Sequence, residues 1–545
     1  MAFSAGIGLA AWTVSLAVVL LRLFAWSSFR RKILRDGRPI RKAPNTLPLV
    51  GNGILFLQPR QKLFSWFVEC ERQTGYETLE ISVPTLPPGV LINDPKNLDF
   101  VFKNEGTFTK GDFVKQRSWD LFGHGIINAD GELWKAQRKA GLGFLSTANL
   151  RVLTDVALPR HIASSVALLQ GRSDGTIVDL QQVFHEITTQ LMGKMAYNME
   201  MHADDSFTSA FDYASGVTAE RFQNPLWFVT EIFFGAKFRR SVKTIKAFGQ
   251  EIVARAASEC SNQGDKVGNT TEDEGIGLDQ VSGTLIKALV EAIGDEQIVA
   301  DAALNYLSAG RDTTAQALTW TFHLLNQHPA VVSRVRSEVR DLLDSHGILN
   351  GIDLDTTLFT PRSMPFTLAV FYESLRLYPP IPFEIKQCSR RVMLPDHTFL
   401  PAGAVVLWCP WAMNRSRTTW GADADSFRPE RWLVEQQPVS HPDEGGVSER
   451  LSRPERTPLS VAVRSAAEFP VFNGGPRLCL GKKMAEAVAV QVISTLVWLF
   501  DFAPADDVSR QNRVSKSSLT LPMDGGLPVL VKPSGRNPVL LKKKV

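Results

Sequence analysis

The feature that most limits what this chain can fold into is a run of 32 residues, Asp295 to Asn326, whose apolar residues recur at spacings of three and four. Such spacing places the apolar residues on one face of a helix. Gly294 before the run and His328-Pro329 after it are residue types that commonly bound a helix. We therefore predict one helix over this run, the longest of the chain.

Shorter stretches with the same spacing predict that most of the middle of the chain is helical. Helices are expected at about 130–146, 150–170, 176–200, 205–222, 240–261, 330–345, 363–377 and 481–498. Short strand-like runs lie at 78–82, 89–92, 392–394, 404–409 and 526–532. The segments 262–283 and 435–467 are rich in polar residues with Gly or Pro and are expected to be surface loops. The mixture predicts a mainly helical α+β body with small sheets.

The N-terminus carries an uncharged run from Ala2 to Leu21, which matches the ~20 residues that a helix needs to cross a bilayer. Positive charges follow this run instead of preceding it, which is unlike a cleaved signal peptide. Because positive flanks stay in the cytosol, the tip should face the lumen. We predict a membrane anchor over residues 1–26, a basic flank with a Pro/Gly hinge over 27–53, and one domain over 54–545; the alternative is a buried first helix.

The charge balance agrees with that division. The chain has a net charge of +4, but residues 1–42 hold eight positive charges and one negative charge, so the remaining 503 residues have a net charge of −3. A near-neutral body gives no support for nucleic-acid binding. The five cysteines are odd in number, scattered and without a CxxC pair, so neither a disulfide framework nor a Cys-rich zinc site is indicated.

One cysteine stands in a specific motif. The segment Phe472 to Gly481 has the pattern F-x-x-G-x-R-x-C-x-G and is followed by an apolar-periodic helix. Glycines permit close backbone approach, and a helix N-terminus stabilises an anionic sulfur. Five fixed positions should coincide by chance on the order of 10⁻⁴ times per chain. Cys479 is therefore predicted to be a functional thiolate.

With this motif the chain resembles the cytochrome P-450 superfamily of haem-thiolate monooxygenases, and four further motifs occur in the family's order. They are W-x-x-x-R at Trp134–Arg138, A/G-G-x-D/E-T-T at Ala309–Thr314, E-x-x-R at Glu373–Arg376 and F-x-P-E-R-F at Phe427–Trp432, where Trp432 replaces the last Phe. The resemblance covers about residues 40 to 535. It implies the cytochrome P-450 fold. The anchor and hinge resemble the eukaryotic microsomal type, in which the body faces the cytosol at the endoplasmic reticulum membrane, and we expect a fungal source.

The resemblance also assigns cofactor contacts. It implies haem b with the Cys479 thiolate as the iron ligand, in a loop that includes Phe472, Gly475 and Gly481. Trp134, Arg138 and Arg477 resemble the family's propionate partners, a use that suits the forked donors of Arg. Where the family often has a further Arg or His, this chain offers only Lys386. Glu373, Arg376 and Arg431 resemble the family's buried triad, which braces the loop leading to the cysteine.

The long helix carries the residues that the resemblance links to oxygen. Ala309 and Gly310 correspond to the place where the family accommodates O₂, the hydroxyl of Thr313 to the group that hydrogen-bonds the bound oxygen, and Asp312 to the acid that relays protons. A Gly inside a helix costs ~1 kcal/mol relative to Ala, and a mid-helix Thr bends the helix slightly. Such local costs at a helix centre also indicate a site.

The substrate is less constrained. The resemblance places Leu304, Asn305, Ile381, Phe383 and Leu519 at the substrate pocket, which would be mainly apolar with Asn305 as its polar handle. The segments 125–131 and 137–139 resemble those of fungal and plant enzymes that hydroxylate fatty acids and alkanes. A lipophilic substrate is therefore our first expectation, and the alternative is oxidative tailoring of a fungal secondary metabolite.

The electron source and the reaction type complete the expectations. No dinucleotide-binding motif is found, so electrons from NADPH should come through a flavoprotein reductase, with cytochrome b5 as a further donor, and Lys135, Lys139, Lys482 and Lys483 could steer such a partner. Two other readings stay open: a haem-thiolate isomerase or dehydratase that does not use O₂, and a non-catalytic membrane-anchored binder of haem or lipid.

Overall fold

The computed structural model describes residues 32–83, 86–172, 175–263, 278–348, 353–435, 459–505, 513–535 and 540–541, together with Ser15. The predicted anchor therefore lies outside the described residues except for Ser15. Most of the two predicted loops, 264–277 and 436–458, also lies outside them.

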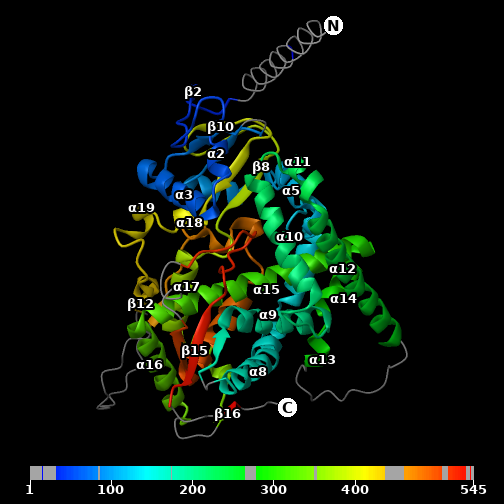
Figure 1. The fold of residues 1–545 in the computed structure, drawn as a ribbon, viewed down its shortest axis with the longest axis vertical. Helices are drawn as coiled ribbons and strands as arrows, with labels where there is room; N and C mark the ends of the chain where they lie inside the picture. Colours follow the sequence, from blue (N-terminus) through cyan, green and yellow to red (C-terminus); the bar gives the residue numbers. More distant parts are fainter. Residues whose placement is uncertain are drawn as a thin grey trace, which may run out of the picture.

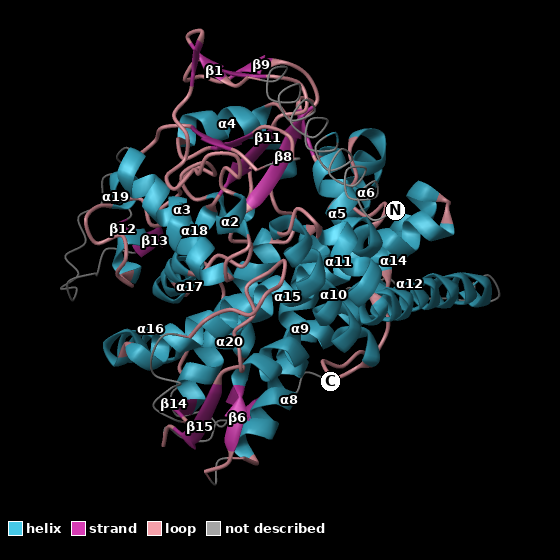
Figure 2. Cartoon of the chain, turned by 45° about the horizontal axis from the view of Figure 1, so that its top comes forward, coloured by secondary structure: helices cyan, strands magenta, loops and turns pink. Residues whose placement is uncertain are grey.

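Helices form the centre of the molecule, and small sheets lie toward its ends (Figure 1, Figure 2). The longest helix, α15, spans Glu296–Gln327 and crosses the middle of the fold. The other helices are α2 (Gly53–Phe56), α3 (Arg60–Thr74), α4 (Pro95–Lys103), α5 (Gly111–Phe122), α6 (Gly131–Phe144), α7 (Thr147–Val152), α8 (Leu158–Gln170), α9 (Leu180–Tyr197), α10 (Ser206–Gln223), α11 (Trp227–Phe234), α12 (Ala236–Gln263), α13 (Leu278–Val281), α14 (Thr284–Ile293), α16 (Pro329–Ser345), α17 (Pro365–Leu377), α18 (Pro410–Met413), α19 (Arg417–Trp420) and α20 (Lys482–Leu499). Short helical turns are the π-turn η1 (Leu153–Ala157) and the 3₁₀ turns η2 (Thr356–Leu358), η3 (Pro429–Trp432), η4 (Pro470–Phe472) and η5 (Gly475–Arg477).

The strands form five small sheets in the described part of the chain. Two lie in the N-terminal part of the fold, with strand orders β2-β1-β10-β9 and β3-β4-β11-β8-β5; the others are β12-β13, β14-β15-β6 and β16-β7. Their bounds are β1 (Leu34–Arg35), β2 (Arg38–Pro39), β3 (Leu79–Ile81), β4 (Gly89–Leu91), β5 (Phe108–Thr109), β6 (Ile177–Asp179), β7 (Asp353–Leu354), β8 (Glu384–Cys388), β9 (Val392–Met393), β10 (Thr398–Leu400), β11 (Val405–Trp408), β12 (Leu433–Glu435), β13 (Leu459–Val461), β14 (Phe500–Pro504), β15 (Pro528–Pro533) and β16 (Leu540–Leu541). The mainly helical fold with small sheets is thus as predicted.

Helix α15 organises the core. The side chain of Asp295 caps its first turn by accepting a hydrogen bond of 3.0 Å from the Ile298 amide, and His328-Pro329 ends it and starts α16. Helices α9, α12, α14, α17 and α20 all pack against it. Because it is surrounded in this way, nearly all of its residues beyond the first turn are buried, polar ones such as Asn305 and Asp312 included.

Strand pairing differs from the prediction at two places, one predicted as helix and one as loop. The segment 176–200 was expected to be one helix, but Ile177–Asp179 forms β6 and pairs with β15, with Val178 opposite Val529. The predicted loop 435–467 begins and ends in paired strands, since Leu433 in β12 lies opposite Val461 in β13. In both cases the strand is only three residues long, too short to show an alternating pattern.

One stretch of the described residues, Thr147–Gln170, is long and apolar enough to cross a membrane by length and composition. It comprises α7, η1 and α8, and its apolar residues Leu153, Leu158, Ile162 and Leu169 are at most 1% exposed in the main core. We therefore interpret this stretch as a core element.

Candidate active site

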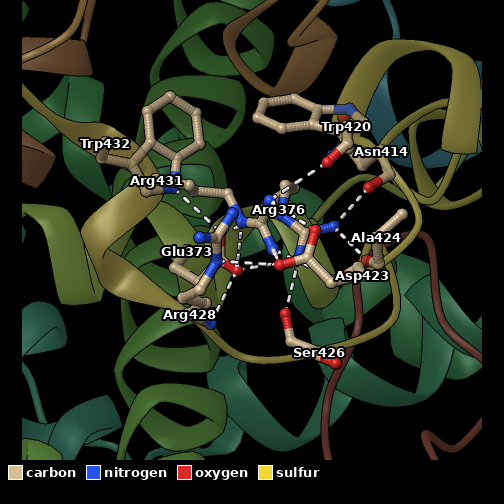
Figure 3. Close-up of polar contacts among 10 residues, drawn as sticks. All are labelled: Glu373, Arg376, Asn414, Trp420, Asp423, Ala424, Ser426, Arg428, Arg431 and Trp432. Atoms are coloured by element: carbon tan, nitrogen blue, oxygen red, sulfur yellow. Dashed lines mark hydrogen bonds and ion pairs between the residues drawn. The ribbon is translucent and has the colours of Figure 1, made fainter.

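A buried carboxylate organises the region before the cysteine loop (Figure 3). Glu373 and Arg376 in α17 are fully buried and lie one helical turn apart, so Nε and Nη2 of Arg376 donate to the two carboxylate oxygens at 2.8 Å each. Nε of Arg431 in η3 donates to the same carboxylate at 2.8 Å. The indole N–H of Trp432 and the backbone N–H of Arg428 add hydrogen bonds of 2.9 Å each. Glu373 thus accepts five hydrogen bonds, which is the satisfaction that a buried charge requires.

The two arginines use their remaining donors to hold the chain between α18 and η3. Arg376 donates to the backbone carbonyls of Asn414, Ala424 and Ser426, and Arg431 donates to those of Trp420 and Asp423 (Figure 3). These carbonyls belong to a segment with little regular structure, so side chains replace the backbone pairing that a helix or sheet would supply. The predicted triad is therefore brought together, and it fixes the loop from 414 to 431.

The cysteine loop is shaped by close backbone approach. The Cys479 amide donates to the Phe472 carbonyl at 2.8 Å, which closes the loop. Gly475 has φ +58°, and a Cβ there would lie 2.2 Å from the Phe102 carbonyl oxygen in α4. A Cβ at Gly474 would lie 2.3 Å from the Phe102 ring. A side chain at either position would push the loop away from α4.

The Cys479 side chain is exposed, whereas Cys70, Cys388 and Cys409 are buried. Desolvation raises the pKa of the Cys479 thiol, and the amides of Gly481 and Lys482 and the positive charges of Arg138 and Lys482 lower it. The amides belong to the start of α20, where a helix N-terminus favours an anion. Cys479 is therefore the cysteine in the described part of the chain that is both accessible and placed to ligate a metal as a thiolate.

A cluster of cations lies beside this loop. The guanidinium groups of Arg138 and Arg477 lie over the Trp134 ring, at 5.5 and 4.2 Å from its centroid. Arg138 donates to the Leu478 carbonyl at 3.0 Å and acts electrostatically on both Cys479 and Tyr306 of α15. These contacts connect α6, the cysteine loop and α15 in one place.

Arg477 has carboxylate partners of its own in this cluster. It donates to Glu105 at 2.6 Å, to Asp130 at 3.0 Å and to the Ala129 carbonyl at 2.9 Å. The motif analysis did not find Glu105 and Asp130, because nothing in their local sequence marks them as partners of a distant Arg. A cofactor carboxylate at Arg477 would share its guanidinium with these two acids.

Lys386 completes the cluster. It lies on β8, where its backbone pairs with Val406 of β11; it is 2% exposed, and its ammonium makes no hydrogen bond or ion pair within the described part of the chain. Burial lowers the pKa of Lys386 to about 8, with Lys110 and Arg477 acting in the same direction and Glu384 and Glu105 against it. A buried ammonium beside Arg477 is placed to take a carboxylate as its counterion.

The accessible face of α15 lies at its middle. From Val299 to Leu325 every residue is buried except Ala309, which is exposed, and Gly310 and Thr313, which are half-buried. Ala309 and Thr313 lie one turn apart on the same face, and the Thr313 hydroxyl donates to the Ala309 carbonyl at 2.8 Å. A Cβ on Gly310 would lie 2.5 Å from the Met192 sulfur, so this glycine also permits the close crossing of α9 and α15.

Asp312 points away from that face into a buried ion network. Its carboxylate accepts from Nε of Arg311, and Nη2 of Arg311 donates to Asp212 on α10. Desolvation raises the pKa of Asp312 to about 6, while Arg311 acts against the shift. Nη1 of Arg311 and Nδ1 of the neighbouring buried His185 have no partner among the described residues. The sequence analysis did not anticipate Arg311 as the link between α15 and α10.

Two predicted pocket residues have other tasks. The side chain of Asn305 is fully buried: it accepts from the Ile127 amide at 3.1 Å and donates to the carbonyls of Phe122 at 3.0 Å and Asp301 at 2.7 Å. Leu304 is 1% exposed and lies against Gly249 of α12. Asn305 is therefore not a free polar handle, and Leu304 is a core residue. Ile381, Phe383 and Leu519 are half-buried, as an apolar pocket wall requires.

Comparison with known proteins decides the family. The family model described as cytochrome P-450 matches residues 42–528. This chain is a cytochrome P-450. It is 29% identical to cytochrome P-450 94B1 of Arabidopsis thaliana over 520 residues, which cover 93% of this chain and 94% of that protein. It is 31% identical to the cytochrome P-450 monooxygenase cyp1 of Mycosarcoma maydis over 486 residues, which cover 86% of this chain and 71% of that protein.

Membership makes this cytochrome P-450 an oxidoreductase that uses haem b, O₂ and NAD(P)H-derived electrons. The residues of the site fit that cofactor. Cys479 is accessible and cradled by amides, Arg138 and Lys386 offer positive charge for propionates, and the accessible turn of α15 at Ala309 lacks bulky side chains. A bound iron would add the positive charge that favours the Cys479 thiolate over the thiol.

The triad gives the first prediction. Glu373→Gln should lower the free energy of unfolding of the holoprotein by about 3–5 kcal/mol, because Arg376 would keep a buried charge without a counterion and Arg431 would keep only its pair with Asp423. Thermal unfolding and haem retention on gel filtration measure the effect. Glu430→Gln, which removes only the exposed pair with Arg334, is the control and should cost less than about 1 kcal/mol. Similar losses in the two variants would contradict the assignment.

Proposed function

We propose that this cytochrome P-450 hydroxylates the alkyl chain of a lipophilic substrate, with electrons from NADPH through a separate flavoprotein reductase. The observation that carries the proposal is the accessible turn of α15, where Ala309 and Thr313 are reachable in a helix that is otherwise buried. Haem b supplies oxygen activation when bound. The protein's part is to hold the substrate, exclude water and deliver protons.

An apolar wall supports an aliphatic substrate. Phe383 packs on two hydrophobic clusters and Leu519 on one, yet both keep accessible surface. The one polar side chain expected there, Asn305, has its hydrogen-bonding atoms engaged by the backbone. A pocket bounded by such residues favours alkyl groups over polar ones.

Proton delivery would run through Thr313 and Asp312. The Thr313 hydroxyl is accessible and donates its single proton to the Ala309 carbonyl, so its oxygen can accept a hydrogen bond from a bound group; it donates to such a group when it releases the carbonyl. Asp312, with its raised pKa, can exchange protons near neutral pH. The unpartnered nitrogen atoms of Arg311 and His185 suit water molecules beside the network that leads to Asp212.

Electron delivery is proposed at the face that carries the start of α20 and α6. Lys135, Lys139 and Lys483 are exposed there and Lys482 is half-buried beside the cysteine loop. An acidic reductase would be steered toward such a surface. Lys135 is held by Glu132 at 2.7 Å, so Lys139, Lys482 and Lys483 are the stronger candidates.

A membrane location is proposed from the anchor sequence and from exposed apolar residues. No residue of α11 is buried, and Phe233 and Phe234 are 73% and 82% exposed. Leu49, near α2, is 75% exposed. Helices α2 and α11 lie at the same end of the molecule as β2 (Figure 1), a strand within the basic flank. Apolar side chains gathered at this end suit contact with the endoplasmic reticulum membrane.

The substrate is tested by reconstituting the full-length protein with a microsomal reductase and NADPH. A panel of fatty acids, alkanes and polyketides is incubated, and products are identified by mass spectrometry with ¹⁸O₂. The proposal predicts a product of an alkyl substrate with one ¹⁸O atom. Conversion without incorporation of ¹⁸O would instead indicate an isomerase or dehydratase, and labelled polyketides alone would indicate secondary-metabolite tailoring.

Thr313 gives the second prediction. Thr313→Ala should divert NADPH consumption from product to hydrogen peroxide, because the hydroxyl that delivers the proton is lost. Product, peroxide and NADPH are measured together. Thr321→Ala is the matched control, since Thr321 makes the same bond to the carbonyl four residues earlier, at 2.7 Å, but is buried. Unchanged coupling in Thr313→Ala would contradict the proton route.

The third prediction concerns α11. A polarity-sensitive dye is attached to Phe233→Cys in the full chain, with Cys260→Ser and with haem bound. In lipid vesicles its emission should shift to the blue, and quenchers carried by the lipids should reduce that emission. The same dye on Val434→Cys, an apolar residue of β12 that is 45% exposed, should report water. Equal quenching at the two positions would refute membrane contact by α11.

A further inference from the structure

Arg60, the first residue of α3, is a buried cation with free donors. It is 6% exposed, and its Nη1 donates to the Lys516 carbonyl at 3.1 Å. Its Nε and Nη2 are shielded from solvent and have no hydrogen-bond partner among the described residues. Burial lowers the pKa of Arg60 to about 9. The opposing electrostatic effect comes from Cys409, and no carboxylate contributes to it.

Two other buried arginines show how these two atoms can bind one carboxylate, although buried Arg117 bonds only backbone carbonyls. Arg376 grips Glu373 with Nε and Nη2, and Arg221 grips Glu231 with the same pair at 2.6 and 2.7 Å. Nε and Nη2 form one edge of the guanidinium and match the two oxygens of a carboxylate. In Arg60 this edge has no carboxylate partner among the described residues.

Arg60 is linked to residues of the wall of the proposed pocket. Its guanidinium carbon lies 5.1 Å from the centroid of Phe64, and the Phe64 ring lies 6.4 Å from that of Phe383. Lys516, whose carbonyl Arg60 holds, lies three residues before Leu519 in the same segment. Phe383 is thus connected to Arg60 through two successive contacts, and Leu519 through one hydrogen bond and three residues of chain.

The start of α3 adds to the preference for an anion. Pro59 stands at the N-cap and offers no side-chain acceptor, and the first turn contains no acidic residue. The helix has 15 residues, so its N-terminus carries the positive end of a full helix dipole. The helix dipole therefore adds to the preference of Arg60 for an anion.

We propose that Arg60 binds the carboxylate of an aliphatic acid and so selects fatty acids over neutral alkyl compounds. The proposal deepens the proposed function, on which it rests, by naming the polar end of the substrate. Because Nε and Nη2 are covered, binding would require the side chains over this edge to move. With the carboxylate held at α3 and the accessible turn on α15, the carbon that is oxidised would lie far from the carboxylate.

The test compares a long-chain fatty acid with its methyl ester, using the spin-state shift of the haem in the full-length holoprotein. Arg60→Met should raise the Kd of the acid about 10- to 100-fold, the range expected for loss of a charge-assisted pair, and leave that of the ester within about twofold. Arg60→Lys, which keeps the charge without the fork, should give an intermediate loss for the acid. Arg72→Met, on the same helix and paired with Asp425 at the surface, should change neither ligand.

Thermal unfolding separates a ligand site from a structural role. An unpaired buried charge disfavours the folded state, so Arg60→Met should unfold at the same or a higher temperature than the wild type. A lower unfolding temperature together with equal losses for acid and ester would mean that Arg60 is only structural, and would overturn the proposal. An unchanged acid-to-ester preference in a variant that still hydroxylates alkyl chains would overturn it as well, while leaving the proposed function intact.

Discussion

The carboxylate of Glu373 is the interaction on which the rest of the site depends. It is a fully buried charge that accepts hydrogen bonds from two arginines, an indole and a backbone amide. Desolvating three charged groups costs several kcal/mol each, so this arrangement is stable only when every donor and acceptor is matched. The arrangement therefore serves mainly to fix the position of the segment from 414 to 431, and it adds less to the net stability of the fold.

The order imposed there passes to the cysteine loop through aromatic packing. The ring centroid of Trp432, which donates to Glu373, lies 4.8 Å from that of Phe469. The ring centroid of Tyr372, the neighbour of Glu373, lies 6.4 Å from that of Phe472. The Phe472 carbonyl in turn holds the Cys479 amide. A chain of contacts thus leads from a buried charge to the thiol, and close packing at Gly474 and Gly475 fixes the other side of the loop against α4.

Features with a local signature could be predicted from the sequence, and features that depend on distant partners could not. Helix α15, the cysteine loop and the pair Glu373–Arg376 have caps, glycines or one-turn spacing that can be recognised in the sequence. The short strand β6 and the acids Glu105 and Asp130 depend on partners more than 300 residues away in sequence. Asn305 was misplaced for the same reason: its sequence position shows which helix it lies on, but not that the loop at Ile127 covers it.

The central claim is that Cys479 binds haem iron as a thiolate in a loop held by these contacts. The carbon monoxide difference spectrum of the reduced full-length protein tests it most directly, since the position of the Soret band reports the axial ligand. We predict the long-wavelength band of a thiolate-ligated haem, and its loss in Cys479→Ser. A band at the position of a His-ligated haem, or a thiolate band that persists in Cys479→Ser, would contradict this account.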